Sequence, residues 1–174
     1  SEDKGLTWEP FPTSPGATGT IPLQTTGNWT KSGGCIAIST PLNIVVIPSN
    51  NSLPWYTKDG GTTWTEIEIS GVATSGETGY GWAYYNTFKC VCADRVNANT
   101  FYIYNYLTQG IYRSTNSGDS WTKMNTGDID VWAAINSHLK AVPGQAGHLF
   151  LAGGKAGNAG DANPGQTLLS RSTD

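Results

Sequence analysis

The sequence predicts an all-β protein in which short antiparallel strands are joined by tight turns. Two observations point to this class: one eight-residue motif recurs at a nearly constant spacing, and the composition suits strands and turns better than helices. The chain has 22 Gly, 9 Pro and 7 Trp among 174 residues, and its charged share of 13% is about half of the usual value of roughly 25%. This composition disfavours a helical bundle and a disordered tail, and the length suits one domain with an apolar core.

The recurring motif has the pattern Ser/Thr-x-Asp/Asn-x-Gly-x-Thr/Ser-Trp. Its copies begin at residues 1, 57 and 114, and another opens at residue 172, so the steps are 56, 57 and 58 residues. The carboxylate or amide at the third position accepts hydrogen bonds from nearby backbone N–H groups, and the glycine supplies a positive φ. The motif therefore predicts a hairpin turn between two antiparallel strands. The residues to which we assign this structural role are Asp3, Trp8, Asp59, Trp64, Asn116 and Trp121.

A full repeat holds four segments rich in residues that favour strands. The predicted strands before the turns are 53–56, 110–112 and 167–169, those after the turns are 64–67 and 121–124, and the upstream pairs are 35–39 with 43–47, 90–93 with 100–104 and 139–142 with 148–152. Four strands in a unit of this length are typical of a β-propeller blade.

The chain is therefore predicted to be a single β-propeller segment, 1–174, of about three four-stranded antiparallel blades. The repeats run approximately over 1–56, 57–113 and 114–171. Propellers typically have four to eight blades, so three blades leave the ring incomplete and expose strand edges. Either the rest of a longer parent polypeptide or identical chains in an oligomer would complete the propeller.

The motif resembles the Asp-box, or BNR repeat, of sialidases, sortilin-type receptors and family 74 glycoside hydrolases. The segments Ala-Asp-Arg-Val-Asn at 93–97 and Leu-Lys-Ala-Val-Pro-Gly at 139–144 most resemble the C-terminal propeller of family 74 xyloglucanases. This resemblance implies a portion of a secreted, extracellular hydrolase of the endo-β-1,4-glucanase or xyloglucanase type, with a plant-type polysaccharide as its substrate. It favours the longer polypeptide over an oligomer, because those enzymes carry two propellers.

Two other readings of the motif belong to different classes. A noncatalytic carbohydrate- or protein-binding Asp-box propeller is the main alternative to the hydrolase. A sialidase is a weaker one, because such enzymes hold a carboxylate with three arginines, and here Arg95, Arg113 and Arg171 are predicted near strands and turns.

The loops opposite the motif turns form the expected substrate face, and several carry aromatic residues. An aromatic ring on a polar, Gly-rich loop can stack on the apolar face of a pyranose, although it can also pack between neighbouring blades. The candidate substrate-binding residues are Trp82, Tyr84, Tyr85, Trp29 and Trp132.

Hydrolysis of a glycosidic bond ordinarily needs two carboxyl groups about 5 to 10 Å apart. Glu77, Asp128, Asp130 and Asp161 lie on the expected substrate loops, whereas Asp94 matches a family position that we interpret as structural. No catalytic residue is assignable, and we expect this chain alone to lack the catalytic pair.

Cysteine, histidine and charge exclude several other functions. The three cysteines, Cys35, Cys90 and Cys92, are interpreted as small buried core residues in preference to a disulfide, and their odd number leaves at least one unpaired. His138 and His148 lack metal-ligand spacing, so neither a metal nor a cofactor is expected. A net charge of -3 without a basic run argues against nucleic acid, and the apolar run 44–47 is too short to cross a membrane.

Overall fold

The computed structural model describes residues 5–8, 34–48, 52–80, 89–125, 129, 137–154 and 167–173. Within these ranges the chain forms eleven strands connected by turns and no helix, so the all-β prediction is confirmed. A helix long and apolar enough for a membrane span is accordingly not found in this part of the chain.

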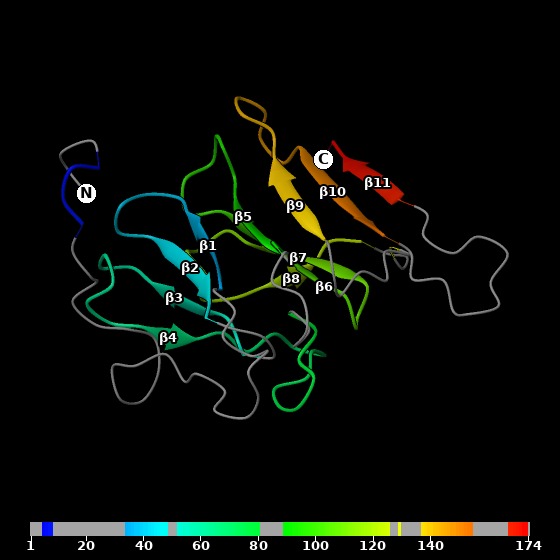
Figure 1. Cartoon of the computed structure of the whole chain (residues 1–174), viewed down its shortest axis with the longest axis horizontal. Helices are drawn as coiled ribbons and strands as arrows, with labels where there is room; N and C mark the ends of the chain where they lie inside the picture. Colours follow the sequence, from blue (N-terminus) through cyan, green and yellow to red (C-terminus); the bar gives the residue numbers. More distant parts are fainter. Residues whose placement is uncertain are drawn as a thin grey trace, which may run out of the picture.

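The strands form three antiparallel sheets that follow one another in chain order across the molecule, from cyan through green to red (Figure 1). The first sheet has the order β1 (Cys35–Ile38), β2 (Ile44–Ile47), β3 (Trp55–Thr57) and β4 (Thr65–Glu66). The second has the order β5 (Val91–Ala93), β6 (Phe101–Asn105), β7 (Gly110–Ser114) and β8 (Thr122–Lys123). In the third, β10 (Leu149–Gly154) lies between β9 (His138–Ala141) and β11 (Thr167–Ser172).

The three sheets share one register at the motif. Thr57 pairs with Ile44, Ser114 pairs with Phe101, and Ser172 pairs with Leu149. In each case the first residue of the motif lies opposite the first residue of its sheet's second strand. The sequence repeat is therefore also a repeat of strand pairing.

The strands beside the turns differ in extent from the predicted ones. β3 begins at Trp55 and not at residue 53, because Pro54 has no N–H to donate to a ladder. Beyond the two-residue strand β4, the N–H of Ile67 still bonds the carbonyl of Pro54 at 2.8 Å. β7 and β11 run further than predicted, to Ser114 and Ser172, because the first motif residue still belongs to the ladder.

A buried hydroxyl organises the motif turns that begin at Thr57 and Ser114. Thr57 is 1% exposed, and its hydroxyl accepts the N–H of Gly61 at 2.9 Å and donates to the Asp59 carboxylate at 2.7 Å. Asp59 in turn accepts the N–H of Thr63 at 2.9 Å and its hydroxyl at 2.6 Å. These hydrogen bonds hold the pKa of Asp59 down at about 2, with the bond from the Thr63 hydroxyl as the largest cause.

The second turn repeats this arrangement with an amide in place of the carboxylate. The Ser114 hydroxyl accepts the N–H of Gly118 at 2.9 Å and donates to the Asn116 side-chain oxygen at 2.9 Å. That oxygen also accepts the N–H of Ser120 at 3.1 Å, while the Asn116 amide donates to the Ser120 hydroxyl at 2.9 Å. An amide and a carboxylate therefore form the same turn. Only one hydrogen bond is reversed: the Thr63 hydroxyl donates to Asp59, whereas the Ser120 hydroxyl accepts from Asn116.

One continuous apolar core joins the three sheets. β6 lies at its centre, where all five residues are buried, and Phe101, Ile103 and Tyr104 have no exposed surface. Val45 from the first sheet and Leu151 from the third belong to the same cluster. The sheets are therefore packed on one another rather than separate.

Polar contacts reinforce this packing at the loops between the first two strands of each sheet. Asp94, after β5, accepts the N–H groups of Val96 and Asn97 and also that of Gly147 from the β9–β10 loop, at 2.9 Å. Partial burial opposes the charged form of Asp94, but the N–H donors outweigh it and lower the pKa of this carboxyl. In the same way, the N–H of Asn99 bonds the Ser39 hydroxyl of the first sheet at 2.8 Å.

The matched turns generate a prediction about Asp59. The change Asp59→Asn should leave the thermal unfolding midpoint nearly unchanged at neutral pH, because Asn116 occupies the equivalent position, whereas Asp59→Ala should lower the midpoint by several degrees. The folded-state pKa of Asp59 lies below the unfolded value of about 3.9. The contribution of the carboxylate is thus present above about pH 4 and is lost as the pH falls toward 2.

Circular dichroism melts of the natural sequence and Asp59→Asn across this acid range check it. A midpoint difference between the two proteins that stays constant with pH would contradict the role given to the carboxylate.

Candidate functional site

The strand order places the motif turns and the expected substrate loops at opposite ends of each sheet. At one end of the second sheet, the motif turn contacts the β5–β6 loop, where the N–H of Ser117 bonds the carbonyl of Asn99 at 2.9 Å. At the other end, the β6–β7 turn meets the segment that follows the first sheet, through the N–H of Tyr106 and the carbonyl of Gly79 at 3.2 Å. The candidate site is this loop end, as far as it is described: residues 68–80 and 105–109.

Asn105 is the centre of the loop end. It is fully buried, and its side-chain amide donates to the carbonyl of Thr78 at 2.8 Å. Its side-chain oxygen accepts the N–H of Thr108 at 3.1 Å and the Thr108 hydroxyl at 3.2 Å. Gly79 lies so close that a Cβ there would be 2.4 Å from the Asn105 oxygen, and its φ of 81° also favours glycine. These contacts fix the segment 78–80 against the β6–β7 turn.

Glu77 is held at the rim of this cluster by a buried tyrosine. Tyr106 is 2% exposed, and its hydroxyl donates a hydrogen bond to the Glu77 carboxylate, which lies at an exposed position. Burial and this bond to Glu77 raise the pKa of Tyr106, so the phenol remains the donor. The arrangement presents an oriented carboxylate that can accept hydrogen bonds from hydroxyl groups of a ligand.

The structure does not bring a catalytic pair together among the residues it describes. Of the four candidate carboxylates, it places Glu77, while Asp128, Asp130 and Asp161 lie outside the described ranges. Asp94 serves the contact between the second and third sheets.

The five candidate substrate-binding aromatics, Trp29, Trp82, Tyr84, Tyr85 and Trp132, all lie outside the described residues. Three of them stand in the segment 81–88, which follows directly on the fixed Gly79 and Tyr80. Tyr80 is 2% exposed, and burial raises the pKa of its hydroxyl. The two residues that precede the aromatic segment are therefore held by burial and a hydrogen bond. The sugar-stacking role of the aromatics remains a prediction.

The motif residues are placed at the turns, apart from Asp3, which lies outside the described ranges. The indole N–H of Trp121 bonds the carbonyl of Gly118 at 2.9 Å, and that of Trp8 bonds the carbonyl of Gly5 at 3.1 Å. Asp59 and Asn116 form the turn hydrogen bonds described above, and Trp64 follows the first of these turns.

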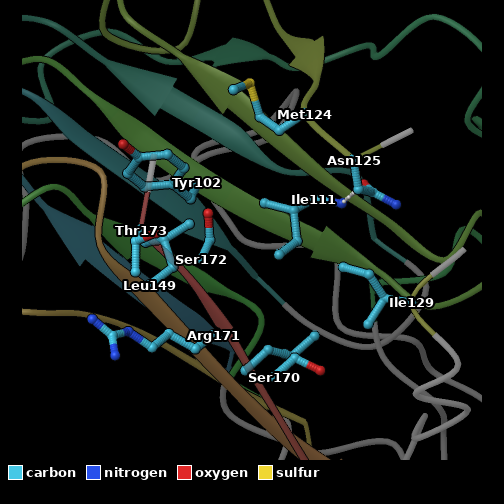
Figure 2. Close-up of a pocket in the computed structure, with 11 residues that line it drawn as sticks. Tyr102, Ile111, Met124, Asn125, Ile129, Leu149, Ser170, Arg171, Ser172 and Thr173 are labelled. Carbon is cyan, nitrogen blue, oxygen red and sulfur yellow. Dashed lines mark hydrogen bonds between the residues drawn. The ribbon is translucent and has the colours of Figure 1, made fainter. Parts of the chain in front are cut away.

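Sequence reasoning missed a cavity of about 520 Å³ that lies between the second and third sheets (Figure 2). Ile111 of the second sheet lies on one side of it, and Leu149, Ser170 and Arg171 of the third sheet lie on the other. The repeat could have signalled it. Met124, 38% exposed on its wall, stands one repeat after Ile67, which is only 2% exposed. The space after the fourth strand is thus filled in the first unit and partly open in the second.

Sequence comparison relates the chain to xyloglucanases. It is 31% identical over 125 residues to a xyloglucanase from a Paenibacillus species, covering 72% of this chain and 10% of that protein. It is 27% identical over 125 residues to a xyloglucanase from Acetivibrio thermocellus, covering 72% of this chain and 12% of that protein. The chain is homologous to these xyloglucanases. It spans about a tenth of their length.

Solved structures similar to the chain include an ancestral GH74 enzyme, with a TM-score of 0.49 and 21% identity over 80% of this chain and 19% of that one. Another is the GH74 xyloglucanase from Xanthomonas campestris, with a TM-score of 0.34 and 22% identity over 69% of this chain and 22% of that one. No protein-family model matches the sequence.

The loop end yields a prediction about Asn105. Its replacement by alanine should lower the free energy of unfolding by about 2–4 kcal/mol, because the Thr78 carbonyl and the Thr108 N–H would lose their buried partner. The matched control is Asn97→Ala on an exposed position, where only the backbone N–H bonds Asp94 and the cost should stay within about 0.5 kcal/mol. Urea titrations of the three proteins measure both values, and equal losses for the two variants would contradict the central position of Asn105.

Proposed function

We propose that this chain is a β-propeller portion of a secreted, family 74-like hydrolase of xyloglucan or a related β-glucan, in which it supplies scaffold and sugar-stacking loops. The observation that carries the proposal is its 31% identity over 125 residues with a protein named a xyloglucanase. A plant polysaccharide is accordingly the proposed ligand, and an extracellular setting the proposed location.

The repeated register supports the interpretation of each sheet as a propeller blade. In all three sheets the motif begins at the residue that faces the first residue of the second strand. The buried hydroxyl and the positive-φ glycines at 61 and 118 give the motif turns the chemistry expected of Asp-boxes. The blades would be completed into a ring by the rest of a parent polypeptide, because the chain spans so little of its relatives.

The proposed division of labour gives binding to this chain and the acid–base pair to another part of the parent protein. Glu77 lies at the loop end with a hydrogen bond from Tyr106 and can serve as an acceptor for sugar hydroxyls. Trp82, Tyr84 and Tyr85, which follow Gly79 and Tyr80 in the sequence, are the proposed sugar-stacking residues. Inverting hydrolysis is the proposed chemistry of the whole enzyme.

If this chain binds sugar, Trp82→Ala should weaken its affinity for xyloglucan oligosaccharides by roughly 3- to 10-fold. This change corresponds to the binding free energy that one stacked aromatic ring contributes. The matched control is Trp8→Ala, because Trp8 is 81% exposed in a motif turn. Isothermal titration calorimetry measures both affinities. Equal weakening by the two changes would contradict the assignment of the loop end as the sugar-binding face.

The catalytic half predicts that the isolated chain releases no reducing sugar from xyloglucan above a heat-inactivated control. Rapid turnover by the chain alone would contradict the proposal that the catalytic pair lies elsewhere. The alternative function, a noncatalytic module that binds protein, would be favoured by the absence of binding heat with every glucan tested.

A further inference from the structure

Two cysteines lie side by side between the first and second sheets. Cys35 is the first residue of β1, and Cys90 comes immediately before β5. Their Sγ atoms are 4.0 Å apart, although 55 positions separate them in the sequence. All three cysteines of the chain are free thiols in this structure.

The repeat brings these two thiols together. Cys35 pairs with Ile47 at the end of β2, and the carbonyl of Cys90 accepts the N–H of Tyr104 in β6 at 2.8 Å. Ile47 and Tyr104 hold the same place in their sheets, each three residues after the strand's first residue. The cysteines therefore occupy equivalent positions in neighbouring units, and β1 packs against β5 where they meet.

The two thiols differ in accessibility and acidity. Cys35 is partly exposed, and its pKa is lowered, with the side-chain hydrogen bond that it shares with Cys90 as the largest cause. Cys90 has no exposed surface, and burial raises the pKa of its thiol. Cys35 is thus the thiol that loses its proton more readily and that a reagent from solution reaches first. Cys90 is covered by protein and reacts only after Cys35.

We propose that Cys35 and Cys90 are a site of reversible oxidation, at which a small-molecule disulfide such as oxidised glutathione converts the pair into a disulfide that joins the first two sheets. The sulfurs need to approach from 4.0 Å to a bond length of about 2.05 Å.

The reaction is two successive thiol–disulfide exchanges. The Cys35 thiolate attacks one sulfur of the reagent, its S–S bond breaks, and one glutathione leaves with the electron pair and takes up the proton that Cys35 has lost. Cys90 then gives up its proton and attacks the Cys35 sulfur of the mixed disulfide, and the second glutathione leaves as a thiol. The two cysteines together lose two electrons and two protons, and the reagent is reduced to two glutathione molecules.

Cys92 stays outside this pair and serves as an internal reference. It lies two residues beyond Cys90, in β5, and burial raises its pKa to about 12. The charged groups that act on it are Lys140, in β9 of the third sheet, and Asp94, which directly follows β5. The third thiol should therefore remain reduced while the other two are oxidised.

The experiment treats the full chain with oxidised glutathione, blocks the remaining thiols with an alkylating reagent, and reads intact mass and non-reduced peptide maps. We expect one blocked thiol per molecule, at Cys92, and one cross-linked peptide pair containing Cys35 and Cys90. The oxidised protein should melt on the order of 10 °C higher than the reduced one, because the cross-link closes a long loop of the unfolded chain.

Three variants make the test specific. Cys92→Ala should form the same cross-link as the natural sequence. Cys90→Ala should accumulate a glutathione adduct on Cys35 without any cross-link, and Cys35→Ala should gain no adduct at Cys90. Three blocked thiols in the natural sequence after this treatment, or a cross-link that includes Cys92, would overturn the proposal; the result with the natural sequence does not depend on how well any variant folds.

Discussion

The buried hydroxyl at the start of the motif turns at Thr57 and Ser114 is the interaction on which the rest of the described fold depends. It closes the turn by accepting the N–H four residues later, from Gly61 or Gly118. The residue that carries it also forms the last pair between the second and third strands of its sheet. One side chain thus sets both the shape of the corner and the register of its sheet. With the register fixed at one end, the loops at the opposite end are free to differ.

The corners also determine how the sheets are stacked. Gly118 lies so close to the first sheet that a Cβ there would be 2.8 Å from the Cβ of Tyr56. Next to it, the Asp119 carboxylate accepts hydrogen bonds from the Tyr56 hydroxyl and the Lys58 ammonium of the preceding unit. The motif turn of one unit therefore packs directly against the sheet of the preceding unit. These contacts set the spacing between the sheets, although they lie at the end of the sheets opposite the loop end.

Much of this fold could be predicted from the sequence because the determinants are local. The hydroxyl, the Asp or Asn, the glycine and the Trp of each motif stand within eight residues, and the strands around them follow from β-forming residues and turn chemistry. Features that join units could not be predicted in this way. The bond from Gly147 to Asp94 and the contact of Cys35 with Cys90 depend on how two sheets stack.

The candidate site was the less predictable part. Glu77 was one of four carboxylates of equal standing in the sequence, and its hydrogen bond to Tyr106 becomes visible only when two distant loops meet. The cysteines were expected to be small core residues, and only Cys90 is fully buried, since Cys35 and Cys92 are partly exposed. The sequence around the candidate aromatics shows no strand or helix periodicity, so the role predicted for them depends on side-chain chemistry alone.

The shared register has a consequence for how such a chain can diverge. The stretch from Ile44 to Phe101 is longer than the stretch from Phe101 to Leu149, yet all three residues pair with the first residue of a motif in the same way. Insertions and deletions between corners are thus absorbed without shifting any strand. If a unit were duplicated, its motif would fix the strand register of the copy without further changes. The connecting segments, and with them the binding specificity, can therefore change while the sheets stay the same.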